Sequence, residues 1–185
     1  ILGLNFVRNW ATKPEIQRKP EAWEAYTVSE RITNICLFTF VKTKKTLLPE
    51  DIAFLIDTWA RYLSNNLEFK GEELTCNHLF NNGRALFFAG FFLKNSDYTE
   101  LARNIFEQTL PKLITKEGFF SEGSSHYHLL FTRWLLEIGF FAKSSGNQIL
   151  MNLVNPACEK LLNRVKFFCV VDREGQIRLP LIGDV

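Results

Sequence analysis

The sequence predicts a mainly α-helical fold built from antiparallel helical hairpins and followed by a short β-hairpin. Apolar residues recur at helical spacing in successive segments, which indicates amphipathic helices. The connections between these segments are short, and short connections favour antiparallel neighbours. After Lys166 the apolar residues alternate instead, which predicts the β-hairpin.

The composition fits one globular domain with a substantial core. The chain has 185 residues, of which 46% are hydrophobic and 14% aromatic. Its 22 basic and 20 acidic residues give a net charge of only +2, and they are scattered, so nucleic acid is not favoured as a partner. Charged residues interrupt every apolar run, so no membrane span is expected. Aromatic faces also stack on sugar rings, which hints at a carbohydrate ligand.

The N-terminal part is predicted to be an irregular lead-in. Residues 1–27 contain Pro14 and Pro20 among scattered aromatic residues. The chain starts at Ile1 with no signal peptide and stops at RLPLIGDV with no polar tail. We therefore expect a piece excised from a longer protein.

The helices are predicted to follow one another from residue 29. Ser29 is expected to cap the first, which continues to about Thr43. Its apolar side is Ile32, Ile35, Cys36 and Phe40. Pro49 starts the second helix. Its buried stripe is Ile52, Leu55, Ile56, Trp59 and Leu63. Further helices are predicted over 72–94, 98–115, 125–143 and 148–165.

The last segment, FFCVVDREGQIRLPLIGDV, alternates around Glu174-Gly175 and is typical of a β-hairpin. The predicted organisation is therefore a helical domain over 1–165 and the start of a β-rich second domain over 166–185.

No cofactor or metal site is predicted. The cysteines show neither a CxxC pair nor zinc-site spacing, so buried thiols are expected. They are Cys36, Cys76, Cys158 and Cys169. The three histidines include no HExxH helix, and phosphate-loop, dinucleotide and nucleophile-elbow motifs are absent.

The helix predicted over 72–94 carries polar residues at its N-terminal half. Asn77, Asn81 and Arg84 share one face, with His78 and Asn82 beside them. Helix N-termini favour anions, so these donors suit a carboxylate or a sulfate. The alternative is an exposed polar stripe, although Lys and Glu are the more usual residues of such a stripe.

The segment SEGSSHYH places His126, Tyr127 and His128 in the first turn of a helix capped by Ser124 or Ser125. A neighbouring cation or donor lowers the pKa of a phenol, which would let Tyr127 act as a base. The alternative is a tyrosine in an ordinary core stripe. That stripe would continue through Leu130 or Phe131, Trp134 and Ile138.

Glycoside hydrolysis needs two carboxyl groups that face one cleft. Glu122 is the single candidate near these motifs, and no second carboxylate stands out. This weighs against a hydrolase without excluding one.

Several of these stretches together resemble the heparinase II/III family of polysaccharide lyases and its alginate-lyase relatives. WEAYTVSERITN (23–34) resembles the family's Trp-x-x-Tyr-x-x-Ser-x-Arg-Ile segment, and NHLFNNGRALFFAGFFL (77–93) its Asn-His-Leu helix. EGSSHYH (122–128) is similar to the Glu-Arg-Ser-x-x-Tyr-His motif, and PLIGD (180–184) to the Gly-Asp segment that leads into a β domain.

The resemblance implies an incomplete α/α toroid of helical hairpins followed by a β-sandwich domain. It implies β-elimination on an acidic, uronic acid-containing polysaccharide. Asn77 and His78 would neutralise the uronate carboxylate, and Tyr127 would act as base at C5, as acid on the leaving O4, or as both. Substrate contacts are expected from the remaining polar residues of the two motifs. They are Glu122, His126, His128, Asn81, Asn82 and Arg84.

The chain also departs from the family pattern. Gly123 stands where the family often has Arg, and the family's further catalytic His belongs to the β domain. The alternative function is therefore a non-catalytic glycan-binding or surface-polysaccharide assembly module. The resemblance suggests a periplasmic or cell-envelope location.

Overall fold

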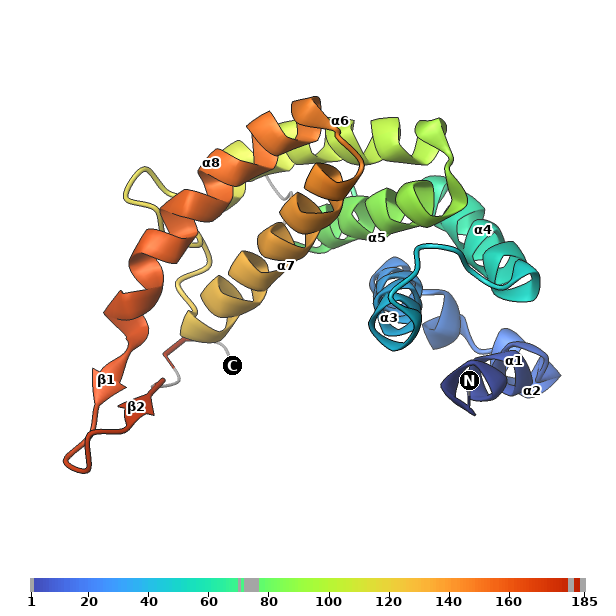
Figure 1. Cartoon of the computed structure of the whole chain (residues 1–185), viewed down its shortest axis with the longest axis horizontal. Helices are drawn as coiled ribbons and strands as arrows, with labels where there is room; N and C mark the ends of the chain where they lie inside the picture. The colour runs from blue at the N-terminus through green and yellow to red at the C-terminus, as the bar shows by residue number, and fades with distance from the viewer. Residues whose placement is uncertain (1, 70, 72–76, 180–181, 184–185) are drawn as a thin grey trace. The chain divides into compact units, whose positions relative to one another are not determined.

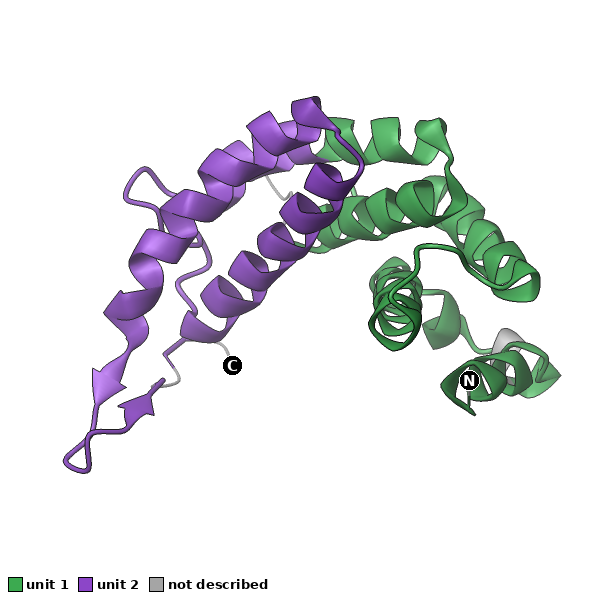
Figure 2. Cartoon of the chain, viewed as in Figure 1, with its two compact units in different colours: residues 1–105 green, residues 106–185 purple. Residues whose placement is uncertain are grey.

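The computed structural model describes residues 2–69, 71, 77–179 and 182–183. The chain divides into two compact units, residues 1–105 and residues 106–185, shown in different colours in Figure 2. The division falls within one helix, α6.

The first unit begins with short helices, so the predicted irregular lead-in over 1–27 is wrong. The structure forms α1 (Leu2–Ala11), α2 (Pro14–Gln17) and a 3-10 helix, η1 (Pro20–Trp23). Pro14 and Pro20 each occupy the first position of a helix. Proline lacks an N–H, but the first turn of a helix has no intrahelical acceptor for that group, so proline is tolerated there. The two prolines therefore separate short helices instead of preventing helix formation.

Helix α3 (Ala25–Thr43) starts earlier than predicted. Ser29 is not its cap, because it lies inside the helix, where its hydroxyl donates to the Ala25 carbonyl at 2.8 Å. A serine can bond to the carbonyl four residues earlier, so this residue type alone does not mark a helix start. Ile32 and Cys36 are buried as predicted.

Helix α4 (Glu50–Ser64) begins after Pro49, and its predicted apolar stripe is confirmed. Ile52, Ile56, Trp59 and Leu63 are buried, and Leu55 is half-buried. Glu50 and Asp51 lie in its first turn, where negative charge is favoured by the helix dipole.

Helices α5 (Asn77–Leu93) and α6 (Ser96–Leu113) follow. The predicted start of α5 at residue 72 lies outside the described residues. Nearly all of α5 is buried, and within the first unit it packs on both α3 and α4. Helix α6 starts two residues before its predicted position because the Asn95 side chain accepts hydrogen bonds from the Asp97 and Tyr98 N–H groups.

The second unit contains the antiparallel hairpin of α7 (Ser125–Ser144) and α8 (Gln148–Val165), which lie side by side in Figure 1. Ser124 caps α7, as predicted, and its hydroxyl accepts from the Tyr127 N–H at 3.2 Å. Asn147 caps α8 through a bond from the Leu150 N–H. The short connection forces the two helices to run in opposite directions.

The predicted β-hairpin is confirmed, but it is short. After a 3-10 turn, η2 (Lys166–Phe168), strands β1 (Val170–Val171) and β2 (Ile177–Arg178) pair antiparallel. The turn between them is organised by Asp172, whose carboxylate accepts from the backbone N–H groups of Glu174 and Gln176.

The cysteine prediction is confirmed at two positions. Cys36 and Cys158 are buried, and burial raises the pKa of both thiols. Cys169 is half-buried, and Cys76 lies outside the described residues. In the described part of the chain, no helix is both long and apolar enough to cross a membrane.

Candidate functional site

The polar face of α5 is buried and is not an exposed polar stripe. Asn77 is 7% exposed, and Asn81, Asn82 and Arg84 are 0% exposed. His78 differs, because its side chain is 42% exposed. Buried amides and a buried guanidinium need hydrogen-bonding partners inside the protein. Most of these partners come from α3.

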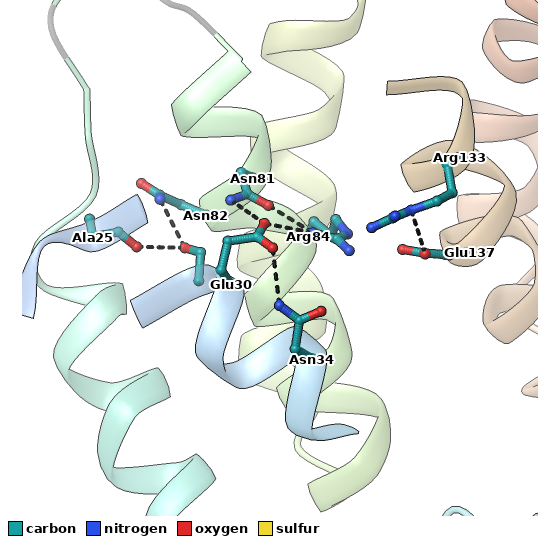
Figure 3. A network of polar contacts seen from close by, with 9 residues as sticks. Ala25, Glu30, Asn34, Asn81, Asn82, Arg84, Arg133 and Glu137 are labelled. Carbon is teal, nitrogen blue, oxygen red and sulfur yellow. Dashed lines mark hydrogen bonds and ion pairs between the residues drawn. The ribbon is translucent and has the colours of Figure 1, made fainter. Parts of the chain in front are cut away.

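Glu30 on α3 is the main partner of this face (Figure 3). Its Oε1 atom accepts from Asn81 Nδ2 at 2.9 Å and from Arg84 Nη1 at 3.0 Å. Arg84 Nη1 also donates to Asn81 Oδ1, and Asn34 Nδ2 donates to Glu30 Oε2. Asn81 and Arg84 were predicted to contact substrate. The structure uses their polar groups to hold α5 on α3, which supports a structural role.

Asn82 links α5 to two other segments. Its Nδ2 donates to Ser29 Oγ at 3.0 Å, and its Oδ1 accepts from the Glu68 backbone N–H at 2.8 Å. Asn82 was also predicted to contact substrate, but both ends of its amide have partners inside the unit. It positions the segment that carries Glu68.

His78 is held from two sides. Its Nδ1 lies 3.1 Å from Glu68 Oε1, and its ring lies 4.8 Å from the ring of Tyr26, at an angle of 45°. The Nε2 atom has no hydrogen bond to any residue in the described ranges. The first unit therefore offers one imidazole nitrogen for a ligand, next to Asn77, the first residue of α5.

Two aromatic contacts, one just before α3 and one within it, hold this helix in the first unit. Trp23 packs edge-to-face on Tyr62 of α4, with ring centroids 4.8 Å apart. The Arg31 guanidinium lies 4.4 Å from the Trp10 ring and 5.1 Å from the Trp59 ring. Burial lowers the pKa of Arg31 to about 10. Trp23 and Arg31 therefore help to fix α3, and α3 in turn supports the polar face of α5.

In the second unit, Tyr127 differs from the core tyrosine of the alternative interpretation. Phe131, Trp134 and Ile138 do form a buried stripe along α7. Tyr127, at the end of that stripe, is only half-buried. Its ring packs near those of Phe120 and His126, and its hydroxyl forms no hydrogen bond within the described part of the chain. The phenol oxygen is therefore not committed to a structural contact among these residues.

The two flanking histidines have different environments. His128 is 1% exposed. Its Nδ1 accepts from the Phe120 N–H at 3.2 Å, and its Nε2 donates to the Leu161 carbonyl at 3.0 Å. Burial lowers its pKa. Both ring nitrogens are used, which supports a core role for His128 instead of the predicted contact with substrate. His126 is exposed, as is Glu122.

The turn before α7 contacts the end of the chain. Ser125 N–H donates to the Ile182 carbonyl at 2.9 Å, and the Ile182 N–H donates to Ser125 Oγ at 2.9 Å. Gly123 has a φ of 71°, and space is open where a Cβ would stand. A side chain at this position would therefore meet backbone strain without a steric clash.

The predicted catalytic residues belong to two different units. Asn77 and His78 lie in the first, and Tyr127 lies in the second, with the exposed His126 and Glu122. Sequence reasoning missed three residues around the first pair: Tyr26, Glu30 and Glu68. Tyr26 and Glu30 lie inside the 23–34 motif, so their place in it was an available signal. Glu68 follows α4 in a connection without periodicity and carried no such signal.

The described residues include no group of three or more His, Cys, Asp or Glu side chains that could hold a metal ion.

The fold and these motifs define a helical domain of the kind found at the N-terminus of heparinase II/III proteins. Residues 4–154 match the family described as Heparinase II/III N-terminus. Because the match covers most of the chain, the protein belongs to the heparinase II/III family. No curated protein matches the chain.

A solved structure supports the fold. The heparan sulfate lyase HepC from Pedobacter heparinus is 18% identical and superposes with a TM-score of 0.60. The match covers 81% of this chain and 24% of HepC, so the chain spans about a quarter of that lyase. The predicted helical-toroid fold class is confirmed by this likeness.

Proposed function

We propose that the chain is the helical domain of a polysaccharide lyase that cleaves an acidic, uronic acid-containing polysaccharide by β-elimination. The observation that carries this proposal is the environment of His78. Its ring is held by Glu68 and Tyr26, while Nε2 has no hydrogen bond within the described part of the chain. The adjacent Asn77 supplies an amide. The amide donates in any state, and Nε2 donates when the imidazole is charged, so in that state both groups suit a uronate carboxylate.

The proposed reaction starts at the carboxylate. Asn77 and His78 bind it and withdraw charge, which makes the C5 proton more acidic. Tyr127 removes that proton, the C4–C5 double bond forms, and the C4–O4 bond breaks. A proton is returned to O4, from Tyr127 itself or from another acid. A half-buried tyrosine whose hydroxyl has no structural partner in the described residues supports this assignment.

Two of the predicted substrate contacts are exposed. His126 and Glu122 are accessible to a polysaccharide. Asn81, Asn82, Arg84 and His128 are proposed as supporting residues, because their polar groups are used inside each unit. Residues 1–165 form the proposed lyase-like domain, and 166–185 begin the segment that leads to a β-sandwich domain.

The test is a lyase assay with the full-length protein. It is incubated with a panel of uronate polymers, and the ultraviolet absorbance of the unsaturated product is followed. Tyr127→Phe removes only the hydroxyl and should abolish the signal. The matched control is Tyr98→Phe, which removes a hydroxyl that bonds to Asp57 in α4 and should keep activity.

The other candidate functions give different outcomes. Oligosaccharide binding without any product, equal in wild type and Tyr127→Phe, would identify a non-catalytic glycan-binding or assembly module. Saturated sugars whose release depends on Glu122 would identify a hydrolase. Either outcome would refute the lyase proposal.

A further inference from the structure

We propose that Glu68 is a positioning residue for His78, which fixes its ring as the Nδ1–H form and leaves Nε2 as the atom available to a ligand. The catalytic consequence of this inference depends on the proposed lyase function. The effect on the imidazole does not depend on it and can be measured separately.

The contact with Glu68 determines which nitrogen of His78 carries the proton. An ionised carboxylate only accepts hydrogen bonds, so Nδ1 must carry the proton when it bonds to Glu68 Oε1 at 3.1 Å. The Nε2 atom then offers a lone pair when the ring is neutral and an N–H when it is charged. In both charge states, Nε2 is the nitrogen that a substrate can reach.

The Glu68 side chain is mostly buried, and its backbone is fixed by a buried residue. Its side chain is 23% exposed, and its Oε2 atom is buried without a hydrogen bond from the described residues. Its backbone N–H donates to Asn82, which is 0% exposed. Asn82 is bonded in turn to Ser29, inside α3. The position of Glu68 is thus set by the buried contact between α3 and α5.

Tyr26 limits the ring from a second direction. Its ring centroid lies 4.8 Å from that of His78, and it belongs to α3, whereas Glu68 follows α4. Two contacts from different elements leave the imidazole little freedom to rotate. A pre-oriented imidazole loses less conformational entropy when a substrate binds, which is the usual benefit of such supporting contacts.

The experiment is nuclear magnetic resonance of isotope-labelled histidine nitrogens in the full-length protein, at a pH where the rings are neutral. His78→Gln and His126→Gln variants assign the signals. Wild type should show His78 as the Nδ1–H tautomer. Glu68→Ala should shift it toward the Nε2–H tautomer, which unrestrained rings favour in water. Glu68→Gln keeps an acceptor oxygen and should restore the wild-type tautomer.

The variants are chosen so that the fold survives. Asn82 bonds to the Glu68 backbone and not to its side chain, so Glu68→Ala keeps that contact. Glu15→Ala, at an exposed position in α2, is the matched control and should leave the His78 signal unchanged. An Nε2–H tautomer in wild type, or an unchanged tautomer in Glu68→Ala, would overturn the inference.

Lyase assays separate this inference from the proposed function. Glu68→Ala should lower kcat/KM roughly tenfold to a hundredfold, the range known for carboxylate partners of metal-binding histidines, with recovery in Glu68→Gln. An unchanged kcat/KM would contradict the positioning role. If wild type cleaves no uronate polymer, the proposed function fails, and the tautomer measurement alone decides the role of Glu68.

Discussion

Replacement of Glu30 by alanine should destabilise the first unit strongly, because it removes a carboxylate that pairs with a buried cation. Arg84 is 0% exposed, and Glu30 Oε1 accepts from both Arg84 and Asn81. Removal of one partner of a buried ion pair costs about 3–5 kcal/mol. The Glu30 side chain is 29% exposed, so water can replace part of the contact. We therefore expect the lower end, about 3 kcal/mol.

Urea unfolding followed by tryptophan fluorescence measures this loss. Trp10, Trp23 and Trp59 lie in the first unit, so the signal reports mainly on its unfolding. Arg61→Ala is the matched control, because it removes the partner of Asp57 in an exposed pair on α4. Exposed pairs contribute about 0–1 kcal/mol, so this variant should change little.

A double variant tests the physical reason for the effect. Glu30→Ala combined with Arg84→Met removes both charges, so no buried ion is left unpaired. It should recover a large part of the stability lost in Glu30→Ala alone. The reasoning is refuted if Glu30→Ala costs no more than Arg61→Ala, or if the double variant is less stable than the sum of the two single losses.

Three further predictions concern the second unit. Burial holds the folded-state pKa of His128 below its unfolded value of about 6.5, so the neutral ring's contribution to stability is complete above that pH and is lost as the pH falls. The urea midpoint should therefore drop on the acid side, and it should drop less in His128→Gln. Ser124→Ala removes the α7 cap and should cost about 1 kcal/mol in the same assay, whereas Ser124→Asp should cost little. Gly123→Ala should cost about 1 kcal/mol from backbone strain alone, because its φ is 71° and space is open; a neutral result would contradict this.

Local signals predicted the fold well where they were unambiguous. The bounds of α8, Gln148–Val165, match the prediction because Asn147 caps a strongly periodic segment. The lead-in was misjudged because proline both interrupts helices and begins them, and only the packing of the following residues distinguishes the two cases. Ser29 was misjudged for a similar reason, since a serine hydroxyl caps a helix or bonds within one.

The candidate site could be predicted only in part. The spacing of Asn77, Asn81 and Arg84 predicted the polar face of α5, but it did not predict that this face is buried. A carboxylate that pairs with Arg84 comes from Glu30, 54 residues earlier in the chain. Helix periodicity carries no information about such distant pairs. The role of Glu68 could not be predicted for the same reason, since its position depends on a bond to Asn82, which no local pattern indicates.

The reciprocal bonds between Ser125 and Ile182 join two residues 57 positions apart and close a loop that contains α7, α8 and the β-hairpin. Separation of the two residues breaks both bonds, so an opening of this loop should expose the amide protons of Ser125 and Ile182 to exchange with solvent in the same event. A chain cut after β2 would lose both bonds. The first turn of the helix that carries Tyr127 would then fray, although every residue of that helix was still present.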